Sequence, residues 1–140
     1  MKKWISDVPN ALGEYGAEIR LVGSECRRCK RVFFPVRKIC PDCLDDKVPL
    51  EKKFLSPVGK IFSFSIAQVA PPGYTVPHVQ AYVDLVEGVR LFALLVNYGN
   101  QQNIRTGMAV ELVTVTVGKD EDDQERLAYR FRPKAERESL

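Results

Sequence analysis

The sequence predicts an all-β protein in which a small metal-binding ribbon precedes a five-stranded barrel, and three observations support this. All four cysteines of the 140-residue chain lie in two Cys-x-x-Cys pairs that ten residues separate. Beyond residue 57, short stretches of aliphatic and aromatic residues alternate with turn residues. No segment has the periodicity of a strong helix. We therefore expect a rubredoxin-like zinc ribbon and then an oligonucleotide/oligosaccharide-binding (OB) barrel.

These features divide the chain into four parts. We expect an N-terminal extension that carries a short helix, capped by Asp7 and beginning near Pro9. The expected boundaries are residues 1–22 for this extension, 23–50 for the ribbon, 51–133 for the barrel and 134–140 for a C-terminal tail.

Composition limits the function classes. With 45% hydrophobic and 28% charged residues the chain can bury one modest core, and it has no run of about 20 apolar residues that could cross a membrane. A net charge of +3 is weaker than the basicity of a dedicated nucleic-acid binder. The first residues form no apolar signal segment, so we expect a reducing, cytoplasmic location.

The two cysteine pairs predict one structural zinc ion. Each pair can form a tight turn, and the four sulfurs of Cys26, Cys29, Cys40 and Cys43 can complete a tetrahedron. Four thiolates would also hold a single iron, which the sequence does not distinguish from zinc. Disulfides would suit a secreted chain, and a redox pair would need a βαβ setting that we do not find. Because four thiolates leave no open position for a substrate water, we expect no catalysis at the metal.

Within the ribbon, residues 18–25 and 32–36 read as short strands. A unit this small cannot bury both of its faces, so some of Phe33, Phe34 and Val36 are expected to pack on the following domain or on another chain. The cationic side chains nearby either offset the −2 charge of a zinc tetrathiolate or grip phosphates, including those of coenzyme A at an interface. These side chains include Arg27, Arg28, Arg31 and Arg37.

Five stretches are predicted as the barrel strands: residues 58–67, 79–87, 89–98, 109–117 and 126–132. A tight turn at Glu87 and Gly88 joins the second and third of them. Residues 44–53 are expected to be a linker, and residues 101–104 one helical turn. The acidic loop at residues 120–123 reads as a solvated turn.

Aromatic residues in these strands bear on an alternative function, the binding of single-stranded nucleic acid. Such binding uses a basic groove and exposed aromatic platforms. Phe62, Phe64, Tyr82 and Phe92 lie among aliphatic residues and are expected in the core, while the basic residues cluster on the ribbon. Both features disfavour a nucleic-acid site.

The motifs occur in a distinctive order. The two cysteine pairs precede residues 58–65, a Pro-Pro-Gly-Tyr stretch at 71–74 with Pro-His-Val at 77–79, and then residues 83–91 and 107–111. From about Gly23 to Phe131 the chain resembles the zinc-ribbon plus OB-fold proteins that accompany thiolases. Lys30 and Leu44 depart from this pattern, since glycine is common at these positions after each cysteine pair.

The resemblance implies an accessory subunit that does no chemistry alone. Members of this family form hetero-oligomers with three kinds of enzyme: thiolases, thiolase-like aldolases that cleave steroid side-chain acyl-CoA esters, and hydroxymethylglutaryl-CoA synthase. The complex with a thiolase is built around the thiolase dimer. Some serve thiolases that act on aromatic succinyl-CoA intermediates. The small protein buttresses the partner's active site or helps form its acyl-CoA channel, and the partner supplies the reactive cysteine and base.

The residues agree with this implication. No cysteine is left over as a nucleophile, and His78, the only histidine, has no evident triad companion, so we expect it to be structural or interfacial. Residues 70–77 contain three prolines and are apolar for a surface loop. We expect Pro72 and Tyr74 to lie against the partner near the acyl-CoA entrance; the alternative is a stiff barrel connection.

Overall fold

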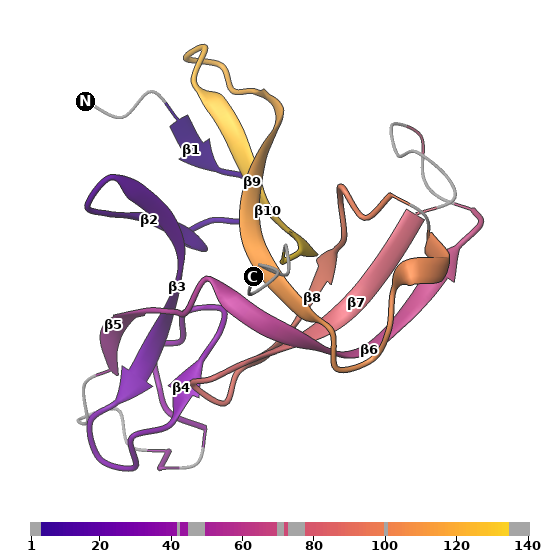
Figure 1. The fold of residues 1–140 in the computed structure, drawn as a ribbon. Helices are drawn as coiled ribbons and strands as arrows, with labels where there is room; N and C mark the ends of the chain where they lie inside the picture. The colour runs from indigo at the N-terminus through magenta and orange to yellow at the C-terminus, as the bar shows by residue number, and fades with distance from the viewer. Residues whose placement is uncertain are drawn as a thin grey trace.

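The chain folds into two connected β-sheets (Figure 1). The structure is a computed structural model that describes residues 4–41, 43–44, 50–69, 72, 78–99 and 101–134. Within these ranges the only helical element is the 3-10 turn η1 (Gln101–Asn103). The strands are β1 (Trp4–Ser6), β2 (Leu12–Tyr15), β3 (Glu18–Cys26), β4 (Val32–Phe33), β5 (Leu50–Phe54), β6 (Val58–Ala67), β7 (His78–Leu85), β8 (Arg90–Leu94), β9 (Ala109–Lys119) and β10 (Glu125–Pro133).

The larger sheet has the order β1-β10-β9-β6-β7-β8 and curls into a partly open barrel. The antiparallel pairs follow the predicted strands, and directly after β8 Leu95 forms a parallel bridge with Phe131 of β10. The amide of Val96 donates to the carbonyl of Phe131 at 2.9 Å beside this bridge. β8 is shorter than the predicted strand: the amide of Leu95 still donates to the carbonyl of Val79 in β7, but the next amide, that of Val96, donates to β10. The all-β class and the five barrel strands are confirmed.

The smaller sheet contains the ribbon and two elements that the sequence did not predict. β3 pairs with β2 over its first half and with β4 and β5 over its second half. The prediction of a short helix before residue 22 is wrong for the described residues: β2 pairs with β3, and β1 adds to the edge of the barrel beside β10. The expected linker at 44–53 likewise ends in strand β5.

One hydrophobic core joins the two sheets. Leu12, Leu21 and Leu55 from the N-terminal half pack in the same cluster as Ile61 and Phe131 from the barrel. Burial of this apolar surface is the main stabilising term, worth about 1.5–3 kcal/mol for each large side chain. The ribbon is thereby fixed to the barrel.

The ribbon also contacts the barrel through its aromatic strand. Phe34 packs edge-to-face on Tyr129 of β10, with ring centroids 5.6 Å apart. The prediction that this ring finds a neighbour is confirmed, and the neighbour is the following domain. No helix in the described part of the chain is long and apolar enough to span a bilayer.

Candidate metal centre and adjoining surfaces

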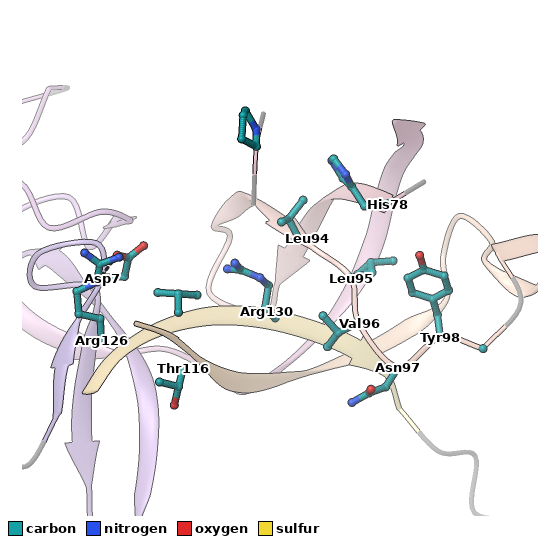
Figure 2. Close-up of a pocket in the computed structure, with 13 residues that line it drawn as sticks. Asp7, His78, Leu94, Leu95, Val96, Asn97, Tyr98, Thr116, Arg126 and Arg130 are labelled. Atoms are coloured by element: carbon teal, nitrogen blue, oxygen red, sulfur yellow. Dashed lines mark ion pairs between the residues drawn. The ribbon is translucent and has the colours of Figure 1, made fainter. Parts of the chain in front are cut away.

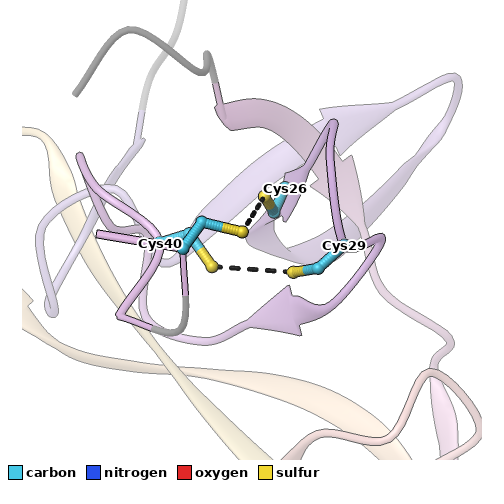
Figure 3. A group of neighbouring side chains, drawn as sticks. Cys26, Cys29 and Cys40 are labelled. Carbon is cyan, nitrogen blue, oxygen red and sulfur yellow. Dashed lines mark hydrogen bonds between the residues drawn. The ribbon is translucent and has the colours of Figure 1, made fainter. Parts of the chain in front are cut away.

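The four cysteines converge at the end of the smaller sheet (Figure 3). Their sulfur atoms all lie within 4.8 Å of one another. The Sγ atoms of Cys26 and Cys43 are 3.8 Å apart, and those of Cys29 and Cys40 are 3.6 Å apart. Sulfurs at the corners of a tetrahedron with Zn–S bonds of about 2.3 Å would lie about 3.8 Å apart. The thiols are therefore placed as a tetrahedral ion requires, and far beyond the ~2.05 Å of a disulfide.

Two equivalent turns hold these thiols. The amide of Lys30 donates to the carbonyl of Cys26 at 2.9 Å, and the amide of Leu44 donates to the carbonyl of Cys40 at 2.8 Å. Lys30 and Leu44 have φ angles of 66° and 50°, the left-handed conformation that glycine adopts most readily. Lysine and leucine thus adopt the turn geometry that glycine usually provides, and their left-handed conformation strains the backbone.

The ionisation of the thiols also points to a cation. Backbone N–H groups of Cys29 and Arg28 lower the pKa of Cys26 to about 6, against the opposing effect of burial. Burial and the neighbouring thiols, Cys26 first, raise the pKa of Cys43 to about 12. The four cysteine sulfurs cannot all carry a negative charge at these distances unless a cation offsets it. A divalent cation held by these sulfurs would supply the compensating charge.

The basic side chains of the ribbon are already engaged in local contacts. Arg27 pairs with Glu51 of β5 at 2.5 Å. The guanidinium groups of Arg31 and Arg37 lie 5.7 Å and 5.6 Å from the centre of the Phe33 ring, on the outside of the ribbon. Phe33 itself is buried beside Cys26 and Cys40. The four predicted arginines therefore surround the cysteine cluster and remain exposed at the surface.

A separate cleft of about 830 Å³ lies on the barrel, at the start of β7 where His78 is found (Figure 2). Its polar side carries two arginines and one aspartate: Arg126 pairs with Asp7 at 3.5 Å, and Arg130 donates to the carbonyl of Tyr129 at 2.9 Å. Leu94 and Val96 supply an apolar wall. The structure brings Pro72 and His78 together here, away from the cysteines; Tyr74 lies outside the described residues.

Three aromatic side chains form an exposed surface that the sequence analysis missed. Phe62, Tyr82 and Phe92 are 47%, 49% and 46% exposed, so the prediction that they belong to the core is wrong. Only Phe64, of the four aromatic residues expected there, packs against the core. The signal was present in the strand phase, because side chains alternate between faces and Tyr82 shares its face with the polar residues Gln80 and Asp84.

Comparison with known proteins matches both parts of the chain. Family models described as the ChsH2 rubredoxin-like zinc ribbon domain and the ChsH2 C-terminal OB-fold domain match residues 14–49 and 53–115. The chain belongs to the ChsH2 family. The ChsH2 assignment confirms a zinc ribbon followed by an OB fold, with four cysteines positioned to bind a metal.

Relatives of this ChsH2-family chain include scaffold proteins and thiolase subunits. A DUF35 domain-containing scaffold protein of Methanocaldococcus jannaschii is 35% identical over 116 residues, which cover 81% of each chain. The benzoylsuccinyl-CoA thiolase subunit BbsA of Thauera aromatica is 33% identical over 80% of this chain and 75% of its own length. Among solved structures, the Ltp2-ChsH2(DUF35) aldolase matches with a TM-score of 0.66 and 30% identity, over 81% of this chain and 84% of that chain.

Proposed function

We propose that this protein is a non-catalytic, zinc-binding accessory subunit of a cytoplasmic thiolase-type acyl-CoA enzyme. The observation that carries the proposal is the likeness, over about four-fifths of the chain, to a subunit of a thiolase and to a chain of an aldolase complex. The partner is a thiolase-fold protein, and the two form a hetero-oligomer around the partner's dimer. Its substrate is a lipid or aromatic acyl-CoA ester.

The chemistry of the chain supports an accessory role. Every cysteine lies in the metal cluster, where zinc binding would occupy the thiolate needed for acyl transfer. Cys26, Cys29, Cys40 and Cys43 would hold the ion, which supplies structural cross-linking when bound. Among the described residues His78 is the only imidazole, and no cysteine lines the cleft beside it. The nucleophile and the general base belong to the partner.

We further propose that the rigid ribbon and barrel buttress the partner's active site and form part of its acyl-CoA channel. The arginines around the cysteine cluster would meet the phosphates of coenzyme A at that interface, since guanidinium groups suit phosphate geometry. Arg28→Glu is expected to raise the KM for the acyl-CoA ester about fivefold, as for an exposed charge contact of about 1 kcal/mol. Lys119→Glu, at the far end of β9, is the matched control and leaves KM unchanged.

The direct test is affinity purification of the tagged chain from its native source. A thiolase-fold protein should co-elute in stoichiometric amount and be identified by mass spectrometry. Elemental analysis should find one zinc ion for each copy of this chain. A solitary monomer, or a chain that carries iron in place of zinc, would contradict the corresponding part of the proposal.

A further inference from the structure

The outer face of the barrel strands β6, β7 and β8 carries side chains in transverse rows, because the three strands are in register. One row is aromatic: Tyr82 lies opposite Phe92, and their rings meet edge-to-face with centroids 5.8 Å apart. Phe62 lies beside them at the irregularity between Ile61 and Ser63 in β6. We call Phe62, Tyr82 and Phe92, with Lys60, Asp84 and Arg90 of the neighbouring row, the aromatic face.

The charged row of this face is preorganised. Both carboxylate oxygens of Asp84 accept hydrogen bonds from Arg90, at 2.6 Å and 3.2 Å. The guanidinium group of Arg90 lies over the Phe62 ring, 3.4 Å from its centre. Arg90 is thus fixed in place before any partner arrives, and its positive charge is balanced by Asp84. Fixed aromatic and arginine side chains are the residues that most often dominate protein–protein binding energy.

The charges of the face distinguish between possible occupants. Lys60 is the one charged member of the aromatic face that has no ion pair with any residue the structure describes. A single-stranded nucleic acid needs a row of available cations to follow its phosphates, and here only one is available. A second copy of this chain would bring the same face, and therefore another lysine and no available carboxylate, to a two-fold contact. A different protein with an apolar centre and an acidic side chain at its edge complements the face.

The same face is continuous with the cleft. His78 and Leu94 lie in the same alternating series as Tyr82 and Phe92, so they project from the same side of the sheet. Both side chains also line the cleft of about 830 Å³. A protein that covers the aromatic face would therefore extend over the mouth of the cleft.

We infer that the aromatic face is the surface on which the thiolase-fold partner docks, with a carboxylate of the partner against Lys60. This inference rests on the proposed function, because that function supplies the partner. Bound in this way, the partner encloses the cleft and turns an open hollow into a cavity shared between the two subunits.

The test uses the thiolase-fold protein that co-elutes from the native source, produced without a tag and titrated against immobilised full-length chain. Tyr82→Ser and Phe92→Ser should each weaken binding about 30-fold, as expected for hot-spot side chains. Tyr82→Phe should bind like the wild type. The matched control is Tyr15→Ser, because Tyr15 is 49% exposed, as Tyr82 is, and also meets a phenylalanine ring edge-to-face, that of Phe54, but stands on the other sheet. Its affinity should stay within about threefold of the wild type.

A second measurement needs no variant. Hydroxyl-radical footprinting of the assembled complex should remove most of the labelling of Tyr82 and Phe92 that the free chain shows, while Tyr15 stays labelled. If the complex forms but the serine variants bind normally and the rings stay labelled, the inference fails and the proposed function stands. If the wild-type chain binds no thiolase-fold protein, both fail. Two results would assign the face to another occupant and overturn the inference. In the first, the wild-type chain self-associates and the Tyr82→Ser variant does not. In the second, the wild-type chain binds a labelled single-stranded oligonucleotide and the variant does not.

Discussion

Replacing Gly23 by alanine should separate the ribbon strands that hold the metal site. Gly23 lies in β3, and a Cβ atom built on it would be 2.3 Å from the carbonyl oxygen of Phe33 in β4. Real Cβ atoms do not approach so closely, and a backbone carbonyl cannot rotate away as a side chain can. The two-residue strand β4 would have to move away from β3, at the point where Ser24 pairs with Phe33.

The size of the effect follows from this geometry. Overpacking against a fixed group costs about 1–3 kcal/mol, and each weakened strand hydrogen bond adds about 1 kcal/mol. We therefore expect Gly23→Ala to lower the free energy of unfolding by about 3 kcal/mol. Gly13→Ala is the matched comparison, because its new Cβ would lie 2.8 Å from Cγ2 of Val22 and 3.1 Å from Cε1 of Phe54, which are side-chain atoms and not a backbone carbonyl. That variant should lose about 1 kcal/mol, the lower end of the cost of overpacking, because the buried Val22 side chain must still move.

Urea unfolding of the zinc-loaded protein, followed by circular dichroism, measures both variants. Release of zinc to a chromogenic chelator provides a second readout, and it should be faster in Gly23→Ala alone. Equal stability of the two variants, to within about 0.5 kcal/mol, would refute the reasoning that β4 is held rigidly against β3.

Three further predictions concern the ribbon. Lys30→Gly should raise the free energy of unfolding by about 0.5–1 kcal/mol in a urea titration, because glycine adopts the left-handed conformation without strain. A loss of stability would contradict this prediction. Phe34→Ala should lower the free energy of unfolding by about 2 kcal/mol in the same assay, since it removes a half-buried ring that packs on Tyr129. An unchanged urea midpoint would show that this contact does not hold the ribbon. Acidification from pH 7 to pH 5 should release zinc to the chelator. A bound cation would hold the pKa of Cys43 below its metal-free value of about 12, so the stability that the metal confers is present at neutral pH and is lost as the pH falls. Full zinc retention at pH 5 would argue against a thiolate site.

The sequence predicted those parts of the fold in which local pattern and tertiary structure agree. The expected strand at 58–67 coincides with β6, because its residues favour strands, although the irregularity between Ile61 and Ser63 breaks the alternation and separates Phe62 from the core face. The cysteine cluster was equally predictable, since the spacing alone restricts which atoms can meet. Glycine is absent after each cysteine pair, yet Lys30 and Leu44 take the conformation that the turn needs.

Elements that depend on distant partners could not be predicted. β1 is three residues long and is a strand only because β10, more than a hundred residues away, pairs with it in parallel. β5 contains Lys52 and Lys53 and lacks an apolar pattern, so its pairing with β3 was not evident. The aromatic face was missed for a related reason. The aliphatic neighbours of Phe62, Tyr82 and Phe92 predict the core, whereas the face to which each side chain points decides its exposure, and for Phe62 the irregularity between Ile61 and Ser63 changes that face.

The central claim is that this chain completes another protein's catalyst and breaks no bond itself. Steady-state turnover of the acyl-CoA ester tests it most directly, with the zinc-loaded chain alone, the thiolase-fold partner alone and the assembled complex measured side by side. The account predicts no turnover by the chain alone and full activity in the complex. Turnover of the thioester by the isolated chain would contradict it.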